Sequence, residues 1–597
     1  MSTVALPDCR CVYQDRLMAE LYMSATCTRH ALPQRLADFP TLSNALDYAA
    51  LGHTGLNFYD GRCRLTAVVQ YATLRRAAQA IARQLRGLGL QRGDRVALIA
   101  DTEPGFMEVF FGCQYAGFVP VPLPIPSGMG NRAPYVEKLR GMLANCMPSA
   151  VLAPKELLAL AREAAPAGLA FIGSVGELKS QPVPQVELTP SRPDEIAYLQ
   201  YTSGSTRFPR GVVVTQRAVM ANLQGMIQHG LGVSPLDRCV SWLPFYHDMG
   251  LVGFVLGPMA SQLSVDYLRT QDFAMRPRQW LNLIGQNGGT ISFAPPFGYD
   301  ICVRRARASD AEQLDLSSWR IAGIGAEPIR AEVLERFAEQ FALAGFDRKA
   351  FLPCYGLAES TLGVTFGRRN SGVRVETVDR RAMERCSVAV AAAAGEQASR
   401  FVNCGPVLPG HRLQIRDGQG KVLPERHVGH VVLQGPSVMS GYYRDPASTG
   451  KVIDTGGWLD TGDLGYLSEG ELFVTGRQKD VLIVRGRNIW PQDIEYLVES
   501  RPEIRPGDAI AFVVPAEPDP VVVVQVQCRV TEPEKRDLLV RTLISLITTE
   551  IGITVTVELV PPHSLPRTSS GKPSRAEARK RFLGQIPADS GLSLAIT

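Results

Sequence analysis

Stretches with the pattern of a β-strand alternate with stretches with the pattern of an α-helix along most of this chain. Residues 71–88 place Leu74, Ala77, Ala78, Ile81 and Leu85 on one side of an amphipathic helix, and two short apolar runs, 95–100 and 195–201, have the length of buried strands. Such alternation predicts an α/β architecture. Because 597 residues exceed what one hydrophobic core supports, we expect two or more domains.

The pattern of predicted strands and helices changes near Gly476. The residues that follow predict a short strand at Asp480–Arg485, a turn at Gly486–Asn488 and a helix that Pro491 opens. This change predicts a domain boundary at residues 476–480.

A second helix is expected further along. The spacing of Thr531 and Glu534 predicts a capping box in front of it. Its apolar positions are Leu538, Leu539, Leu543, Ile547 and Ile551. Residues 553–559 then alternate as a strand does, so the segment after Gly476 predicts a small α+β module.

Composition excludes several classes of function. A net charge of +5 without a Lys/Arg-rich run does not indicate nucleic-acid binding. No uninterrupted apolar stretch has the length of a membrane span, and the first thirty residues lack the pattern of a secretory signal. The twelve cysteines show no paired spacing apart from Cys9 and Cys11, which favours reduced thiols. We therefore expect a cytoplasmic protein.

Two glycine-containing segments could contact a nucleotide. Tyr201–Gly211 follows a predicted strand, and its hydroxyls and backbone N–H groups could bind phosphate oxygens. It is not a Walker P-loop, and an ordinary Ser/Thr-rich turn explains it equally well on its own. Gly323–Pro328 superficially resembles a dinucleotide fingerprint, but Pro328 replaces the third glycine, so a Rossmann site is not indicated.

Three further segments contribute charged side chains. Glu359, at the end of Tyr355–Glu359, could hold a Mg²⁺ that bridges ATP phosphates. Asp463, between Trp458 and the run Gly476–Asp480, could accept both hydroxyls of a ribose. Lys572 closes Leu565–Lys572, a Gly/Ser-rich loop. Each of these residues, taken singly, is explained as well by an exposed, solvated side chain.

In this order and spacing, the five segments resemble the acyl-adenylate-forming superfamily of acyl-CoA synthetases, luciferases and adenylation domains. The resemblance implies a large N-terminal domain of mixed α/β sheets with a distorted barrel, and a small mobile α+β C-terminal domain. The boundaries that it implies are 1–34 for an N-terminal extension, 35–476 for the AMP-binding domain, 477–480 for the hinge and 481–597 for the lid domain.

The resemblance also implies how ATP is bound. The phosphates would contact Thr202, Ser203, Gly204, Ser205, Thr206 and Arg207. The adenine pocket would contain Gly325, Ala326, Glu327, Cys354, Tyr355 and Gly356. Asp463 would hold the ribose, and Arg477 would contact ribose or phosphate.

Catalysis is assigned by the same resemblance to Lys572, Thr202, Glu359 and His247. Glu359 would coordinate Mg²⁺, and Lys572 would bridge the carboxylate of the acid and the α-phosphate. Lys479 matches the hinge residue about which the small domain swings. One departure is Arg210, where the superfamily usually has lysine, so the geometry of its contact differs.

Three motifs are similar to those of fatty acyl-AMP ligases in particular: Leu199–Thr206, Leu243–Leu251 and Ala294–Asp300. In addition, the irregular residues 367–400 lie where that family carries an insertion, which is thought to restrain the small domain and disfavour coenzyme A.

A pocket for an alkyl chain is expected to be formed by Phe245, His247, Asp248, Met249, Gly250, Phe254 and Phe297. Burying such a chain contributes about 0.8 kcal/mol per CH₂ group. The alternative for each apolar member is a place in the ordinary core.

We therefore expect an enzyme that uses ATP and Mg²⁺ to convert a medium- or long-chain fatty acid into an acyl-adenylate, releasing pyrophosphate. It would then transfer the acyl group to a separate holo acyl carrier protein or to a carrier domain of a polyketide or peptide synthase. The nearest alternative is an acyl-CoA synthetase. An enzyme for aryl or amino acids and a catalytically silent adenylate-binding scaffold are the others.

Overall fold

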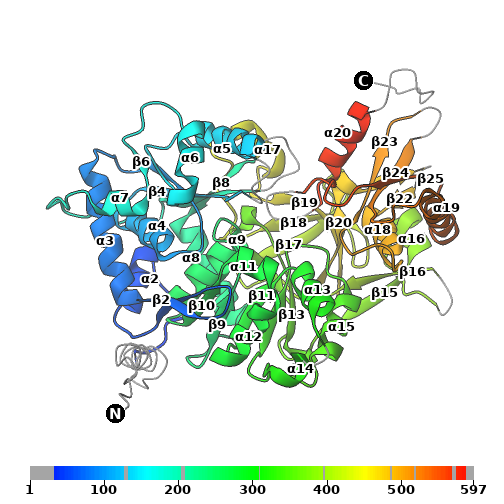
Figure 1. Ribbon diagram of the computed structural model, residues 1–597, viewed down its shortest axis with the longest axis horizontal. Coiled ribbons are helices and arrows are strands. Elements are labelled where there is room, and N and C mark those ends of the chain that lie inside the picture. The colour runs from blue at the N-terminus through cyan, green and yellow to red at the C-terminus, as the bar shows by residue number, and fades with distance from the viewer. Residues whose placement is uncertain are drawn as a thin grey trace, which may run out of the picture.

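The computed structural model describes residues 32–126, 132–202, 209–307, 310–393, 397–484, 487–516, 520–567 and 573–585. Figure 1 shows a large α/β body, coloured blue to green, and a smaller unit at the opposite end that holds the last strands and helices. The predicted α/β architecture and the small α+β C-terminal unit are both confirmed.

An eight-stranded sheet forms the centre of the large body. Its order is β14-β13-β12-β11-β9-β10-β1-β2; the six inner strands are parallel and the two edge strands antiparallel. Parallel strands are buried on both faces, which explains their nearly continuous apolar sequences. The bounds in that order are Gly363–Phe366, Phe351–Gly356, Ile321–Ile324, Ile291–Ala294, Arg238–Ser241, Ser264–Leu268, Gly55–Tyr59 and Leu65–Gln70.

A second parallel sheet has the order β4-β3-β5-β6, and a hairpin, β7–β8, packs beside β4. The bounds in that order are Val119–Leu123, Arg95–Ile99, Ala150–Leu152, Phe171–Gly173, Ile196–Tyr201 and Gly211–Thr215. The two strands predicted at 95–100 and 195–201 are therefore confirmed as β3 and β7.

Helix α3 (Tyr71–Gly87) confirms the predicted amphipathic helix. Its apolar face is buried against α4 (Pro104–Ala116), as the spacing of Leu74, Ala78 and Ile81 requires. The remaining helices of the large body are α2 (Leu42–Ala49), α5 (Arg132–Cys146), α6 (Leu158–Ala164), α7 (Val175–Lys179), α8 (Gln216–Gln224), α9 (Asp248–Gly250), α10 (Gly257–Ala260), α11 (Thr270–Met275), α12 (Arg278–Asn287), α13 (Pro296–Arg305), α14 (Asp310–Gln313), α15 (Ala331–Gln340) and α17 (Pro446–Val452).

Several short helical turns join these elements. The π-helical segments are η2 (Gly225–Leu231) and η3 (Leu251–Leu256), and the 3₁₀ turns are η1 (Lys155–Leu157), η4 (Arg348–Ala350), η5 (Ala358–Ser360) and η6 (Gln478–Asp480). The π-helical segments continue α8 and α9, and such segments occur often at functional sites.

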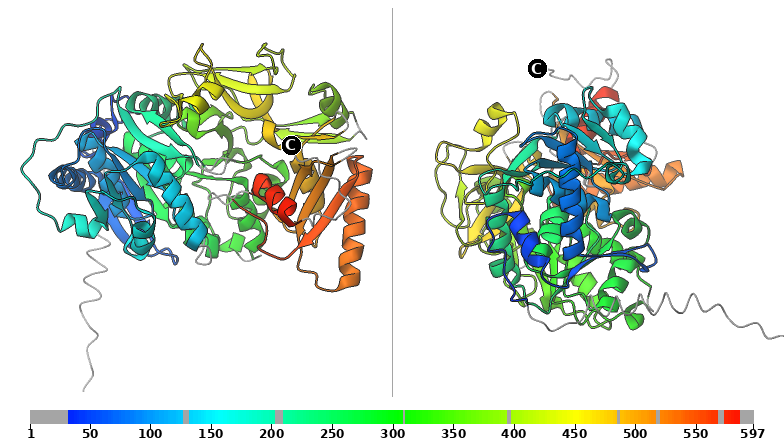
Figure 2. Two further views of the ribbon diagram at one scale, coloured as in Figure 1. Left: turned by 90° about the horizontal axis from the view of Figure 1, so that it is seen from above. Right: turned by 90° about the vertical axis from the view of Figure 1, so that its left-hand side faces the viewer.

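A four-stranded antiparallel sheet, coloured yellow, lies along one long side of the molecule in the left view of Figure 2. Its strands are β17 (Arg412–Arg416), β18 (Gly429–Gln434), β19 (Leu459–Ser468) and β20 (Glu471–Arg477). The expectation of a distorted barrel is wrong, because no sheet closes among the described residues. At its two outer strands the sheet makes only isolated backbone bridges, Asn403↔Phe473 at β20 and Arg416↔Val422 at β17, among the described residues.

Residues 367–400, expected to be irregular, contain a small strand–helix–strand unit: β15 (Val375–Asp379), α16 (Arg380–Cys386) and β16 (Ala398–Val402). Its apolar side chains share a buried cluster with β19, β20 and Trp490. The unit therefore contacts both the large body and the start of the small one.

The C-terminal unit has its own core around the three-stranded sheet β23-β24-β25. Its elements are β21 (Leu482–Val484), β22 (Arg487–Ile489), α18 (Pro491–Glu499), β23 (Ala509–Val514), β24 (Val521–Gln527), α19 (Pro533–Glu550), β25 (Val555–Val560) and α20 (Arg575–Gln585). Strands β21 and β22 form a separate two-stranded sheet that precedes the three-stranded one in the chain.

Two local predictions for this unit are wrong. The expected turn over Gly486–Asn488 extends too far, because Arg487 and Asn488 pair with β21 as strand β22. The expected capping box is absent: Glu532 is the N-cap of α19 and makes no side-chain cap bond. Pro533 takes the first helical position and so leaves Thr531 outside the helix.

Among the described residues, no helix has the length and apolar character needed to cross a membrane. The cysteines of those same residues carry free thiols, and most of them are buried. Cys9, Cys11 and Cys27 lie outside the described residues.

Candidate functional site

The residues predicted to form an adenine pocket lie where two parallel strands, β12 and β13, end side by side. Strands β12 and β13 pair in parallel. Gly325 follows the last residue of β12 and Gly356 is the last residue of β13, so both lie at the same edge of the sheet. In open α/β sheets this carboxyl edge is where ligands bind. A Cβ on Gly325 would lie 2.9 Å from Sγ of Cys354, so only glycine permits this approach. Ala326, with φ 69°, continues the turn. Glu327 follows directly.

Tyr355 and Asp463, 108 residues apart in sequence, are joined by a hydrogen bond. The Tyr355 hydroxyl donates to Oδ2 of Asp463 over 2.7 Å. Arg477, which pairs with Asp463 across β19 and β20, places Nε 3.3 Å from the other carboxylate oxygen. The Asp463 carboxylate raises the pKa of Arg477, and burial together with Asp463 raises the pKa of Tyr355. The tertiary structure therefore combines the predicted ribose and adenine residues in one cluster.

Glu359 lies on the 3₁₀ turn η5, between β13 and β14. Its Oε1 accepts a hydrogen bond of 2.9 Å from the hydroxyl of Tyr442. Burial raises the pKa of Glu359, and the nearby Asp248 adds to this effect, against the opposing influence of Tyr442 and Arg477. A desolvated carboxylate favours a bound cation, so Glu359 fits a divalent metal ion.

The described residues contain no cluster of three or more His, Cys, Asp or Glu side chains with the geometry of a metal site. Magnesium does not need such a cluster, since it commonly takes one or two protein carboxylates, with phosphate oxygens and water completing its shell. The single carboxylate of Glu359 suits this mode of binding.

Arg210, the departure from the superfamily pattern, lies close to this carboxylate. Its guanidinium carbon is 5.1 Å from the ring centroid of Tyr442, and its Nε is 3.9 Å from Oδ2 of Asp445. Tyr442 thus stands between Arg210 and Glu359. Tyr442 is not among the predicted site residues, and no motif in the residues around it marks it as one.

His247 is the N-cap of the short helix α9, and Asp248 is the first residue of that helix. Nδ1 of His247 lies 2.7 Å from Oδ1 of Asp248, and the same oxygen accepts the backbone N–H of Met249 over 2.7 Å. The Met249 N–H also lies 3.3 Å from Nδ1 of His247, which accepts it, so the imidazole caps the start of α9. Gly250 is required here, since a Cβ would lie 2.2 Å from the carbonyl oxygen of Pro244.

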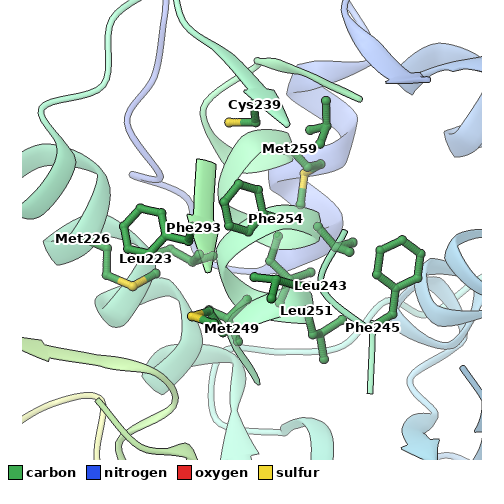
Figure 3. Packing of buried hydrophobic residues seen from close by; sticks show 14 of the residues in the cluster. Leu223, Met226, Cys239, Leu243, Phe245, Met249, Leu251, Phe254, Met259 and Phe293 are labelled. Carbon is green, nitrogen blue, oxygen red and sulfur yellow. The ribbon is translucent and has the colours of Figure 1, made fainter. Parts of the chain in front are cut away.

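Most of the apolar residues expected to contact the alkyl chain belong to the buried core of the large body. Figure 3 shows Phe254 beside Phe293, with Phe245 apart from both. The Phe245 ring is fully buried, 5.4 Å from that of Phe106. Met249 is also buried, whereas Phe297 on α13 is 39% exposed. Three of the four apolar side chains therefore lie in the closed core of this structure.

Most of the residues expected to bind phosphate, and the lysine expected to act in catalysis, lie outside the described residues. Thr202 is described, and its N–H donates to the carbonyl of Arg210 over 3.1 Å, closing the base of the loop. The remaining predicted residues lie outside the described residues: Ser203, Gly204, Ser205, Thr206, Arg207 and Lys572.

Lys479, the expected hinge residue, is exposed on η6. Its neighbour Asp480 is held by Arg575, whose Nη1 lies 2.7 Å from Oδ2 of Asp480. Arg575 also forms a bidentate pair with Glu495 of α18. The residues that follow Lys479 are thus fixed to the C-terminal unit.

Known proteins match this chain over most of its length. The model of the AMP-binding enzyme family matches residues 56–443. A Caulobacter vibrioides protein, provisionally described as an acyl-CoA synthetase, is 44% identical over 96% of this chain and 100% of its own length. JamA of Moorena producens, a medium-chain-fatty-acid–[acyl-carrier-protein] ligase, is 33% identical over 92% of this chain and 95% of its own.

A solved structure, from a study of fatty acyl-adenylate ligases of E. coli and L. pneumophila, superimposes with a TM-score of 0.89. It is 56% identical in sequence and covers 92% of this chain and 99% of its own. The similarity therefore includes both the large body and the C-terminal unit.

Proposed function

Since this chain belongs to the AMP-binding enzyme family, we propose that it activates a medium- or long-chain fatty acid with ATP and transfers the acyl group to the thiol of a separate carrier protein. One observation carries the proposal: Tyr355, Asp463 and Arg477 form a cluster at the carboxyl edge of the central sheet, where ligands bind in such folds. The chain that holds this cluster is 56% identical to one solved in a study of fatty acyl-adenylate ligases.

In the first step, a carboxylate oxygen of the fatty acid attacks the α-phosphorus of ATP. The bond to the bridging oxygen breaks, and pyrophosphate leaves with its electron pair. Such a reaction depends on positioning and charge neutralisation. Asp463 would accept the ribose hydroxyls, while Arg477 would contact ribose or phosphate. Gly325 and its neighbours would leave room for the adenine.

Glu359 would hold Mg²⁺, which neutralises phosphate charge when it is bound. The segment Thr202–Arg207 would contact the phosphates. Lys572 would bridge the fatty carboxylate and the α-phosphate, and His247 would orient the carboxylate. In the second step, the carrier thiolate attacks the acyl carbonyl and AMP leaves.

We further propose that residues 367–400 restrain the C-terminal unit, which would otherwise swing about Lys479. This is supported by Glu384 of α16, which is buried and pairs with Arg487 of β22. Arg487 also donates to the carbonyls of Ile551 and Gly552. A restrained C-terminal unit would disfavour coenzyme A as acceptor.

A second candidate is an acyl-CoA synthetase with the same first step. It is favoured by the relative that is 44% identical over nearly the whole chain and is provisionally described in that way. The two functions differ only in the acceptor thiol.

The test compares acceptors directly. The purified protein is incubated with ATP, Mg²⁺ and fatty acids of graded length, and acyl-adenylate is measured by mass spectrometry. Acyl-adenylate that a holo carrier protein discharges and coenzyme A does not would support the carrier ligase. Rapid acyl-CoA formation would establish the synthetase instead. No acid-dependent pyrophosphate release with any acid would indicate a silent scaffold.

A matched pair of variants ties the reaction to the site. Glu359→Gln removes the carboxylate charge and should lower pyrophosphate release by about 10²- to 10³-fold, the loss typical of one preorganised catalytic group. Glu339→Gln makes the same change at an exposed position on α15 and should leave the rate unchanged. Equal rates for both variants would remove Glu359 from the mechanism.

A further inference from the structure

The backbone immediately after Glu359 has an uncommon conformation. Thr361 has φ 68° and ψ −57°, and the N–H of Leu362 donates to the carbonyl of Ser360 over 2.8 Å. This is a three-residue γ-turn with a positive φ at its centre, a rare and strained form. A β-branched residue is especially unfavourable there. The chain therefore retains a strained threonine two residues from its candidate metal ligand.

Strain of this kind persists only where surrounding contacts enforce it, and it is common at functional sites. Here the contacts come from Ser437. Oγ1 of Thr361 donates to the carbonyl of Ser437 over 2.8 Å, and the hydroxyls of Ser360 and Ser437 are 3.0 Å apart. All three side chains are buried.

The same segment also holds Glu359 itself. The N–H of Met439 donates to the carbonyl of Glu359 over 2.8 Å, and Tyr442 donates to its carboxylate. Glu359, Ser360 and Thr361 are thus each bonded to residues 437–442. Neither the backbone nor the carboxylate of Glu359 can shift without breaking part of this set.

We propose that Thr361 is a positioning residue for the metal-binding carboxylate: its hydrogen bond to Ser437 maintains the γ-turn, and the γ-turn fixes the backbone that carries Glu359. This inference rests on the proposed role of Glu359. The Thr361 side chain is buried, and its hydroxyl bonds to Ser437, so its proposed effect on the metal is through Glu359. Partners that orient a metal ligand typically change metal affinity about 10- to 100-fold when they are removed.

The chain offers a matched control for the substitution. Thr365, on β14, is also fully buried, and its Oγ1 donates to the carbonyl of Cys404 over 2.7 Å. Thr361→Val and Thr365→Val therefore delete the same kind of hydrogen bond without a change of shape. Only the first bond belongs to the turn that carries Glu359.

The experiment measures metal binding without turnover. Mn²⁺ is titrated into each full-length protein in the presence of α,β-methylene-ATP, and the bound ion is measured by electron paramagnetic resonance. Thr361→Val should weaken Mn²⁺ binding by about tenfold or more, and Thr365→Val should stay within about twofold of the unaltered protein. Thr361→Ser, which keeps the donor, should restore most of the affinity. Thermal unfolding of each variant confirms that it is folded.

Equal Mn²⁺ affinity in the two valine variants would overturn the positioning role, as would an unaltered protein that retains no Mn²⁺ with the nucleotide. Failure of the proposed function has a different signature. In that case the unaltered protein would bind Mn²⁺ and the nucleotide, the threonine variants would differ as expected, and no fatty acid would stimulate pyrophosphate release.

Discussion

The guanidinium carbon of Arg330 lies 3.4 Å from the centroid of the Tyr496 ring. Arg330 immediately precedes α15 in the large body, whereas Tyr496 belongs to α18 of the C-terminal unit. The same guanidinium places Nη2 2.6 Å from Oε2 of Glu499, a side chain that is only 2% exposed. A cation in contact with both an aromatic face and a buried carboxylate joins the two units.

Arg330→Leu should weaken this junction strongly. Removing one partner of a buried ion pair leaves an uncompensated charge and typically costs about 3–5 kcal/mol. We expect the C-terminal unit to unfold at lower urea concentration and to be cleaved faster by trypsin. Arg304→Leu is the control, because Arg304 pairs with Asp300 inside the large body alone. Identical urea profiles for the two variants would contradict the junction.

Tyr355→Phe should weaken ATP binding by about tenfold. A hydrogen bond to a charged group contributes about 1.5–3 kcal/mol, and its loss leaves the Asp463 carboxylate with one fewer contact to orient it toward the proposed ribose position. The KM for ATP is measured by pyrophosphate exchange at saturating fatty acid. Tyr71→Phe deletes a similar buried hydrogen bond, to the carbonyl of Leu263, and should not change that KM. An unchanged KM in Tyr355→Phe would show that Asp463 does not depend on this bond.

Lys572→Ala should abolish most adenylation and leave the fold intact. A preorganised cation at the reacting groups is typically worth on the order of 10²–10³ in rate. Pyrophosphate release and the unfolding midpoint are measured together, with Lys580→Ala as a control on the exposed face of α20. Near-normal release by Lys572→Ala would remove this lysine from the proposed mechanism.

His411 should make stability depend on pH in the acidic range. Its Nε2 lies 2.6 Å from the Ser437 hydroxyl, and burial lowers the pKa of the imidazole below its usual 6.5. The unfolded chain therefore takes up a proton more readily than the folded one. The stabilisation is complete above pH 6.5 and is lost as the pH falls through the lowered pKa.

The check is the free energy of unfolding as a function of pH. The decline below pH 6.5 should be shallower in His411→Gln, whose amide still accepts a hydrogen bond but does not titrate. His53→Gln, at an exposed position, should keep the slope of the unaltered protein. An identical slope in all three proteins would exclude His411 as the group responsible.

Local patterns predicted the elements that depend on their own residues. The apolar spacing of α3 and the short apolar runs of β3 and β7 specify these elements, because burial of one face or of both faces follows directly from the period of the sequence. Predictions that needed the exact start of an element were weaker. The capping box at Thr531 was wrong because Pro533 moved the start of α19, and the turn at Gly486–Asn488 gave way to pairing with β21.

Motif order by itself identified the family, and with it the expected roles of Glu359, Asp463 and Lys572. It could not reveal which partners hold these groups. Tyr442 reaches Glu359 from 83 residues away, and Tyr355 reaches Asp463 from 108. Contacts at such separations depend on how sheets and loops pack.

The sequence by itself determined the alternation of helices and strands, the position of the change near Gly476 and the set of residues suited to a nucleotide. Only the tertiary structure decided that the β17–β20 sheet stays open, that Phe245 lies in the core, and that Ser437 holds a strained turn at Thr361. The physical reason is the separation along the sequence over which each interaction acts. Periodicity and propensity act between neighbours in sequence, whereas closure, burial and strain are set by groups that meet only after the chain has folded.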